Sequence, residues 1–400
     1  MPMVFAWWGV MLRKAVVCGI LILVVPHSAW AEDEFVASLR LRGGYDSNPQ
    51  FSNGGGIGGS AFVGTDASMV AAHKDGDTSL GVAAEANQTQ YANPQATAAL
   101  SGKVIIRGML GGDDLNVSSV TTIADTSTYN LRSSDFIQSV KGEAKVGSYK
   151  LFATVEGARS SLNQTNAIFQ DFLPEAQQYL RGTLIPGIAY VSGKFEIGTS
   201  INLSIRRYAQ EFDVFGYRRD NERIQPFIFA KYADKDFSVT GSLSQLRGTW
   251  HDPDFSNVKE LLYEGHLHWR RDALTLDLTA WKRANETTFP ISPITIDAAY
   301  TGKLSWAASP KLTLSAAAGY ATTRYLDSPF DARTATVAFG GSYDLGGDYA
   351  LGLDLTYARG ILISGDRAGA LILSSSITKK FSPFAKAAAA KDKAEASRKI

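Results

Sequence analysis

Cysteine is nearly absent from this 400-residue sequence. The single cysteine, Cys18, lies inside an N-terminal segment that has the features of a presequence. The rest of the chain has no thiol, which excludes disulfides, a cysteine nucleophile and a thiolate metal site from the mature protein. An exported chain without disulfides therefore needs another source of stability.

A long hydrophobic run is missing as well. The apolar residues 15–25 are fewer than the roughly 20 that a membrane-spanning helix needs. Arg13 and Lys14 precede this run, and Ala29-Trp30-Ala31 follows it. That order is typical of a secretory signal peptide, so we predict a signal peptide over residues 1–31, cleaved after Ala31, rather than a membrane anchor.

An excess of charge of one sign is also lacking. The sequence has 40 Lys and Arg residues against 39 Asp and Glu residues. A basic footprint of the kind that binds nucleic acid is therefore not present, and we expect no nucleic-acid partner. No linker or shift in composition divides the chain before Phe381, so we expect one continuous architecture over residues 32–381.

Convincing helical periodicity is absent from the mature region, and a period of two takes its place. In residues 195–206 the odd positions carry Phe, Ile, Thr and Leu, whereas the even positions are largely polar. Residues 274–280 and 294–306 alternate in the same way. Because successive side chains of a strand point to opposite faces, this pattern predicts a long series of β-strands.

Short turns and long loops alternate along the chain, as expected of consecutive hairpins. The short turns fall at residues 75–77, 147–148, 192–193, 233–235, 270–272, 307–310 and 346–348. The longer loops fall at residues 46–59, 160–177, 209–221 and 250–256. The hairpins give about 18 strands, with 16 as the alternative count. Residues 115–124 and 224–232 are the least clearly patterned. We predict an all-β, transmembrane antiparallel up-and-down β-barrel.

A soluble sandwich would alternate too, but three features favour a membrane barrel. The strands are longer than the 5–6 residues of an average globular strand, and the loop asymmetry continues along the whole chain. Aromatic residues also recur where strands meet the short turns, as in an interfacial girdle. They are Tyr149, Phe195, Phe237, Trp269, Trp306, Tyr343, Tyr349 and Phe381.

The last predicted strand is AGALILSSSITKKF, residues 368–381. It resembles the C-terminal insertion signal of bacterial outer-membrane proteins, in which outward apolar residues end in an aromatic. The matching residues are Leu371, Leu373, Ile377 and Phe381. Lys379 falls on the same outward face, and near the rim it can reach the interface. Residues 382–400 form a basic Ala/Lys-rich tail, which we expect in the periplasm as a short helix or a disordered segment.

A second resemblance lies in the first strand, where residues 44–49 read Gly-Tyr-Asp-Ser-Asn-Pro. This is similar to the opening of the outer-membrane β-barrel porins that are associated with exopolysaccharide loci. Residues 309–320, with Ser-Pro-x-Leu-x-Leu leading to Gly-Tyr, resemble the repeated hairpin units of the same family. The resemblance implies a porin-like barrel in the outer membrane of a Gram-negative bacterium, with polysaccharide as a candidate solute.

Candidates for catalysis or metal binding are few. Glu264, His266 and His268 share one face of a strand, where a metal could bind, but a polar lumen wall is the simpler interpretation. His251 with Ser256 and Asn257 is the nearest approach to a nucleophile and base, in a loop of turn-forming residues. We therefore expect no catalytic residue, no metal and no cofactor, and we predict that the protein is not an enzyme.

Charged residues of both signs fall on the predicted inner face. The pore-lining candidates are Arg40, Arg42, Glu196, Arg206, Glu264, His266, His268, Asp277 and Asp354. Two long loops combine aromatic and charged residues and are candidates to fold into the lumen as a plug. Their residues are Phe169, Phe172, Phe212, Phe215, Tyr217, Arg218 and Arg219.

The leading functional hypothesis is an outer-membrane, porin-like channel for passive passage of hydrophilic solutes, with polysaccharide export as its specific form. The alternative is a non-conducting structural or adhesion barrel whose long loops bind a partner. A barrel enzyme that acts on lipid or glycan is less favoured. The expected partners are outer-membrane lipid, the barrel-assembly machinery and a polysaccharide.

Overall fold

The computed structural model describes residues 34–52, 58–96, 98–112, 114–127, 131–164, 177–289 and 292–382. The predicted signal peptide, the tail beyond residue 382, Phe169 and Phe172 lie outside the described residues. Within the described part of the chain, no helix is long and apolar enough to span a membrane.

In these described ranges, eighteen strands follow one another and form a single sheet. They are β1 (Glu34–Asp46), β2 (Ser60–Asp75), β3 (Thr78–Tyr91), β4 (Ala99–Gly111), β5 (Leu115–Ser127), β6 (Leu131–Val146), β7 (Tyr149–Gln164), β8 (Gln177–Ser192), β9 (Phe195–Tyr208), β10 (Asn221–Ala233), β11 (Phe237–Trp250), β12 (Val258–Arg271), β13 (Leu274–Glu286), β14 (Ile294–Ala307), β15 (Leu312–Tyr325), β16 (Asp331–Gly346), β17 (Tyr349–Ile361) and β18 (Arg367–Phe381).

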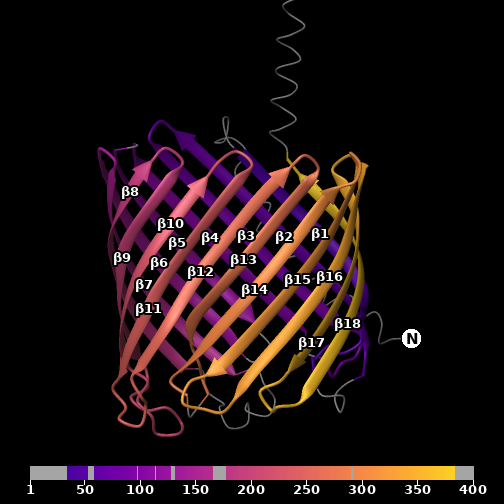
Figure 1. Ribbon diagram of the computed structural model, residues 1–400. Helices are drawn as coiled ribbons and strands as arrows, with labels where there is room; N and C mark the ends of the chain where they lie inside the picture. Colours follow the sequence, from indigo (N-terminus) through magenta and orange to yellow (C-terminus); the bar gives the residue numbers. More distant parts are fainter. Residues whose placement is uncertain are drawn as a thin grey trace, which may run out of the picture.

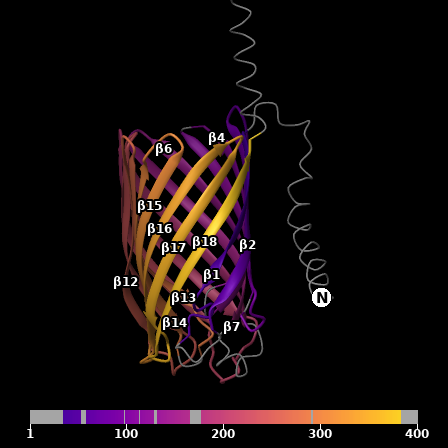
Figure 2. The ribbon, with the colours of Figure 1, turned by 90° about the vertical axis from the view of Figure 1, so that its right-hand side faces the viewer.

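The sheet closes on itself as an antiparallel up-and-down barrel of tilted strands (Figures 1 and 2). Each strand pairs with its neighbours in sequence, and β1 pairs with β18 from Ala37↔Phe381 to Asp46↔Ile372. In Figure 2 the yellow β18 accordingly lies beside the indigo β1. The predicted fold class is confirmed with the higher of the two strand counts, because residues 115–127 and 221–233 are both strands.

The alternating pattern separates an apolar outer face from a polar inner face. On β17 the outward Leu353 and Leu355 are 59% and 39% exposed on the protein surface, where lipid would cover them. The intervening Asp354 points the other way and pairs with Arg40 of β1. Large apolar side chains exposed in this way on almost every strand make the outer wall a hydrophobic band.

Short turns join the strands at one end of the barrel, and the long loops lie at the other end (Figure 1). Several turns require a left-handed backbone, which glycine adopts without strain: φ is 52° at Gly76 and 61° at Gly147. In outer-membrane barrels the short turns face the periplasm. The short turns therefore assign this end to the periplasm, and the aromatic residues predicted for the girdle border it.

The periplasmic rim also carries a charged contact between adjacent turns. Lys194 Nζ lies 2.6 Å from Asp234 Oδ2. The hydrogen bond between these side chains lowers the pKa of Asp234 and raises the pKa of Lys194. Both side chains are exposed to water, so this ion pair contributes little to the stability of the barrel.

The last strand places its predicted outward residues as expected. Leu371, Leu373, Ile377 and Phe381 are exposed and alternate with inward Ile372, Ser374, Ser376 and Thr378. Lys379 Nζ donates a hydrogen bond to the Gly347 carbonyl oxygen at 2.6 Å and lies 3.9 Å from the centre of the Tyr349 ring. The ammonium group therefore reaches the periplasmic rim, and its position on the outward face is accounted for.

We predict that an arginine on the outer wall destabilises the barrel far more than one on the inner wall. Leu355→Arg, at the middle of β17, would place a charge in hydrocarbon and lower the unfolding free energy by about 2–4 kcal/mol. Thr356→Arg, on the inward face of the same strand, is the matched control. Urea unfolding in lipid vesicles measures both, and equal losses would contradict the assignment of the two faces.

Candidate functional site in the barrel lumen

Contacts between strands that are not neighbours identify the inner face. Glu286 ends β13, yet its carboxylate meets Arg206 of β9 and Arg223 of β10. Side chains from strands so far apart around the wall can meet only inside the barrel. Because directly paired residues point to the same side of a sheet, the register carries this assignment from Arg206 to every other strand.

All nine predicted pore-lining residues have inward register. Arg206 is paired with Asn221, Glu196 with Lys231, and Glu264 with Ser242. His266 lies between Thr240 and Thr279, and His268 lies beside Asp277. Arg40 and Arg42 face inward from β1, as does Asp354 from β17. Their placement agrees with a polar lumen, while their part in conduction stays a prediction.

Most of these charged side chains form an ion pair with a residue of a nearby strand. Arg40 Nη2 lies 2.6 Å from Asp354 Oδ2, and Arg42 Nε lies 3.1 Å from Asp66 Oδ2. These side chains keep about a quarter to two fifths of their surface exposed. Charges that are paired and still partly accessible suit a hydrated interior, in which water shares their solvation.

The same arrangement recurs elsewhere on the inner wall. Glu196 Oε1 lies 2.5 Å from Lys150 Nζ, and Glu264 Oε1 lies 2.7 Å from Arg283 Nη2. His268 Nδ1 is 2.7 Å from Asp277 Oδ1. The predicted residues are therefore distributed around the barrel as separate pairs, and they do not converge on one reactive centre.

One cluster differs because it is buried. Glu286 Oε1 accepts a hydrogen bond from Arg223 Nη2 at 2.6 Å, and Glu286 Oε2 accepts one from Tyr208 Oη at 2.9 Å. Arg206 Nε faces Oε1 at 2.6 Å as an ion pair without hydrogen-bond geometry. The three charged side chains are at most 10% exposed. Buried away from water, the carboxylate of Glu286 is stable only while both arginines compensate its negative charge.

Glu286 can reach this position because the ends of β13 and β14 bend into the barrel. Pairing of β12 with β13 stops at Tyr263↔Lys282, although both strands continue. Beyond that point, Ile294 and Ile296 pack on Leu246 and Leu262, which are inward residues of β11 and β12. The extracellular tip of the β13–β14 hairpin, described over residues 284–289 and 292–296, therefore covers part of the inner wall.

Arg219 fixes this β13–β14 tip from the neighbouring loop. Its Nη1 donates to the carbonyl oxygens of Thr287 at 3.0 Å and Ser292 at 3.1 Å, and its Nη2 donates to that of Phe289 at 2.8 Å. Its Nε donates to Asp213 Oδ2 at 2.8 Å. One buried guanidinium thus holds the backbone of the tip in place and links it to residues 209–221.

The β13–β14 tip is an inward segment that the sequence analysis did not single out. Phe169 and Phe172 lie outside the described residues, so the plug expected from their loop stays a prediction. Loop 209–221 contributes the clamp, and its Tyr217 stacks on Phe255 with ring centres 5.0 Å apart. Phe212 and Phe215 are exposed, and Arg218 pairs with the exposed Glu211. For residues 284–296 the sequence signal was the apolar pair Ile294 and Ile296 beside Glu286, which strand alternation alone assigns to lipid.

His251 and Ser256, two of the alternative catalytic candidates, form their hydrogen bonds with other residues. His251 Nε2 lies 3.1 Å from Glu222 Oε1, whereas the backbone amide of Ser256 donates to Asp327 Oδ2. His268 is paired with Asp277 rather than grouped with Glu264. Among the described residues, no group of three or more His, Cys, Asp or Glu side chains has the arrangement of a metal site.

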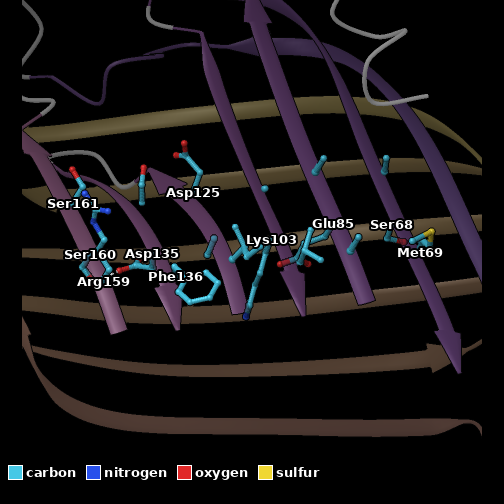
Figure 3. Close-up of a pocket in the computed structure, with 18 of the residues that line it drawn as sticks. Ser68, Met69, Glu85, Lys103, Asp125, Asp135, Phe136, Arg159, Ser160 and Ser161 are labelled. Carbon is cyan, nitrogen blue, oxygen red and sulfur yellow. Dashed lines mark hydrogen bonds between the residues drawn. The ribbon is translucent and has the colours of Figure 1, made fainter. Parts of the chain in front are cut away.

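A recess on the wall of β2–β7 lies on the other side of the sheet (Figure 3). Its outward lining combines small residues, such as Ala67, Ala84 and Gly102, with the larger Met69 and Phe136. Glu85 and Lys103, which Figure 3 shows on neighbouring strands, belong to the inward register. The recess is thus a dent in the lipid-facing surface and separate from the lumen.

A closed barrel with an apolar outer wall, an aromatic rim and a charged lumen defines an outer-membrane protein of the porin type. In agreement, residues 188–365 match the family model described as "Putative beta-barrel porin 2". This match, which spans less than half of the chain, supports the outer-membrane β-barrel porin that the sequence resemblance implied, and the protein is located in the bacterial outer membrane.

Solved structures similar to this chain include OccK2 (OpdF) of Pseudomonas aeruginosa, with 10% identity and a TM-score of 0.46. A BenF-like porin of Pseudomonas fluorescens Pf-5 also has 10% identity and a TM-score of 0.46. Each match covers 88% of this chain and 99% of the other. A comparison with curated proteins finds no match.

We expect Glu286→Gln to loosen the β13–β14 tip. The substitution leaves Arg206 and Arg223 buried without a counter-charge, which costs about 3–5 kcal/mol where such a pair is broken. Hydrogen exchange at residues 284–286 and 294–296 should accelerate strongly. Glu264→Gln, which breaks a more exposed pair, is the control and should leave that exchange unchanged. Unaltered protection in the first variant would show that the carboxylate does not anchor the tip.

Proposed function

We propose that this protein is a channel for the passive passage of hydrophilic solutes across the outer membrane. The observation that carries the proposal is a closed barrel of 18 strands whose inward residues are polar and charged. Barrels of 16–18 strands are wide enough to leave an aqueous passage, whereas smaller ones are filled by side chains.

The β13–β14 tip narrows this passage at the extracellular mouth on the side of β9–β12. The opposite wall, from β15 to β18, has small inward residues, including Gly319, Gly340 and Gly352, and hydroxyl groups such as Ser374 and Ser376. Small side chains leave space where the tip does not reach. At the extracellular mouth the solute path therefore runs along the wall of β15–β18, beyond the Arg40–Asp354 pair.

Polysaccharide export is the specific form of the function that we propose. Its support is the Gly-Tyr-Asp-Ser-Asn-Pro motif at residues 44–49, which resembles porins associated with exopolysaccharide loci. A lumen of paired charges and hydroxyl groups offers hydrogen bonds to sugar hydroxyls along its length.

A binding role for the long loops is the second candidate. Phe212 and Phe215 of loop 209–221 are 51% and 44% exposed, although the loop itself is held by buried contacts of Arg219. Exposed aromatic residues on a fixed support are typical of surfaces that bind a partner. A purely adhesive barrel would bind through these residues and would not conduct.

Planar bilayers distinguish the two functions. The purified protein should give stepwise ion conductance, and replacing residues 287–293 by Asn-Gly should enlarge the steps because it shortens the β13–β14 tip. A matched control deletes residues 93–95 of the β3–β4 loop, which lies at the same mouth but forms no hydrogen bond or ion pair with the described residues of the β13–β14 tip. A barrel that stays electrically silent in all three forms, although correctly folded by heat-modifiable migration on a gel, would defeat the channel function.

A further inference from the structure

The periplasmic end of the inner wall has an arrangement that the channel function alone does not require. We propose that Phe152, Phe227 and Phe229, with the lysines around them, form a binding subsite for an acidic sugar unit that enters from the periplasm. The proposal rests on the channel function and adds to it a place and a chemical class for the solute.

The three phenylalanines belong to the inward face and contact one another. Phe229 is paired in register with Gly198, and Phe227 with Ser200, on the inward side of β9 and β10. Phe152 of β7 has its ring centre 6.0 Å from that of Phe229, which in turn lies 6.2 Å from that of Phe227. Aromatic rings at these distances form one continuous apolar surface inside an otherwise polar lumen.

Two glycines make room for these rings on the intervening strands. A Cβ atom at Gly187 of β8 would lie 2.3 Å from Cζ of Phe152, and one at Gly198 of β9 would lie 2.4 Å from Cζ of Phe229. Each ring therefore lies along the wall, over the backbone of a neighbouring strand, instead of projecting across the lumen. The result is an aromatic floor from β7 to β10 that a solute can pass over without obstruction.

Lysines surround this aromatic floor. Lys141 Nζ lies 5.3 Å from the ring centre of Phe152 and 2.7 Å from Glu143 Oε1. Lys150 Nζ lies between Glu196 Oε1 at 2.5 Å and Glu143 Oε1 at 3.7 Å. Lys145 and Lys231 share the inward register but have no carboxylate partner among the described residues. Four lysines thus face two glutamates, which leaves an excess of positive charge.

Aromatic surface and positive charge together select one kind of ligand. The C–H faces of a sugar ring pack on aromatic side chains, and its hydroxyl groups bind to lysines and glutamates. A carboxylate on the sugar would take the ammonium groups that lack a partner in the protein. A neutral apolar molecule would leave the lysines unused, and a cation would be repelled, so an acidic sugar fits the whole set.

The position of the subsite indicates the direction from which the solute arrives. Lys150 is the second residue of β7 and Glu196 is the second residue of β9, and both strands begin at periplasmic turns. A solute from the periplasm meets these residues before it reaches the buried cluster of Glu286 at the other end. The excess positive charge near the entrance also draws an anionic chain toward the lumen.

The test measures block of single-channel current by defined oligosaccharides. Oligogalacturonate is the acidic probe, and a maltooligosaccharide of equal length is the neutral one. We expect the acidic probe, added on the periplasmic side, to interrupt the current at lower concentration than the neutral probe. Phe229→Ala should weaken the block by both probes by about threefold to tenfold, because the loss is that of an aromatic contact.

Two further variants separate the effect of charge in the subsite from a general effect of substitution on the barrel. Lys231→Gln should weaken block by the acidic probe and leave block by the neutral probe unchanged. Phe136→Ala, which removes an aromatic residue from the lipid-facing side of β6, should change neither. A conducting channel that the acidic probe does not block, or that both probes block equally, would overturn the acidic-sugar subsite and leave the channel function standing. Absence of any conductance would instead defeat the channel function.

Discussion

The pairing of β1 with β18 is the constraint on which the rest of the molecule depends. Every backbone N–H and C=O group that faces hydrocarbon must be bonded within the protein, because lipid offers no replacement for water. An open sheet of 18 strands would leave two unpaired edges, and the register from Ala37↔Phe381 to Asp46↔Ile372 removes both. Closure therefore supplies the stability that a chain with one cysteine cannot obtain from disulfides.

Much of the fold follows from the local alternation of apolar and polar residues, because each strand of a closed barrel has only a lipid-facing side and a lumen-facing side. Alternation in β9 and β17 assigns outward leucines and isoleucines, and Gly76 and Gly147 mark turns that need a left-handed backbone. Even the apparent exception, Lys379, obeys the rule once the length of its side chain is considered. Strand number, face and turn position were predictable because each depends on residues close together in sequence.

The candidate site was less predictable, because it depends on contacts that sequence spacing does not encode. Strand alternation assigns Ile296 to the same lipid-facing side as Tyr300. In the structure Ile296 is instead buried against Leu262, because β13 separates from β12 near this end of the hairpin. Whether a strand end bends inward depends on a partner surface elsewhere, here the inward residues of β11 and β12. The position of Glu286 beside Arg206 likewise results from that bend, and no local motif records it.

The inner wall formed by β15–β18 and the inner wall formed by β6–β10 carry different kinds of side chain. A barrel needs an even distribution of outward apolar residues, since lipid surrounds it uniformly, but nothing requires its inner face to be uniform. Most inward residues of β15–β18 are small or carry hydroxyl groups, whereas β6–β10 carry Phe152, Phe229, Lys150 and Arg206. Small residues on one side leave width, and large residues on the other offer contacts. Selection for a solute can therefore act on one wall without disturbing the closed hydrogen-bond network of the barrel.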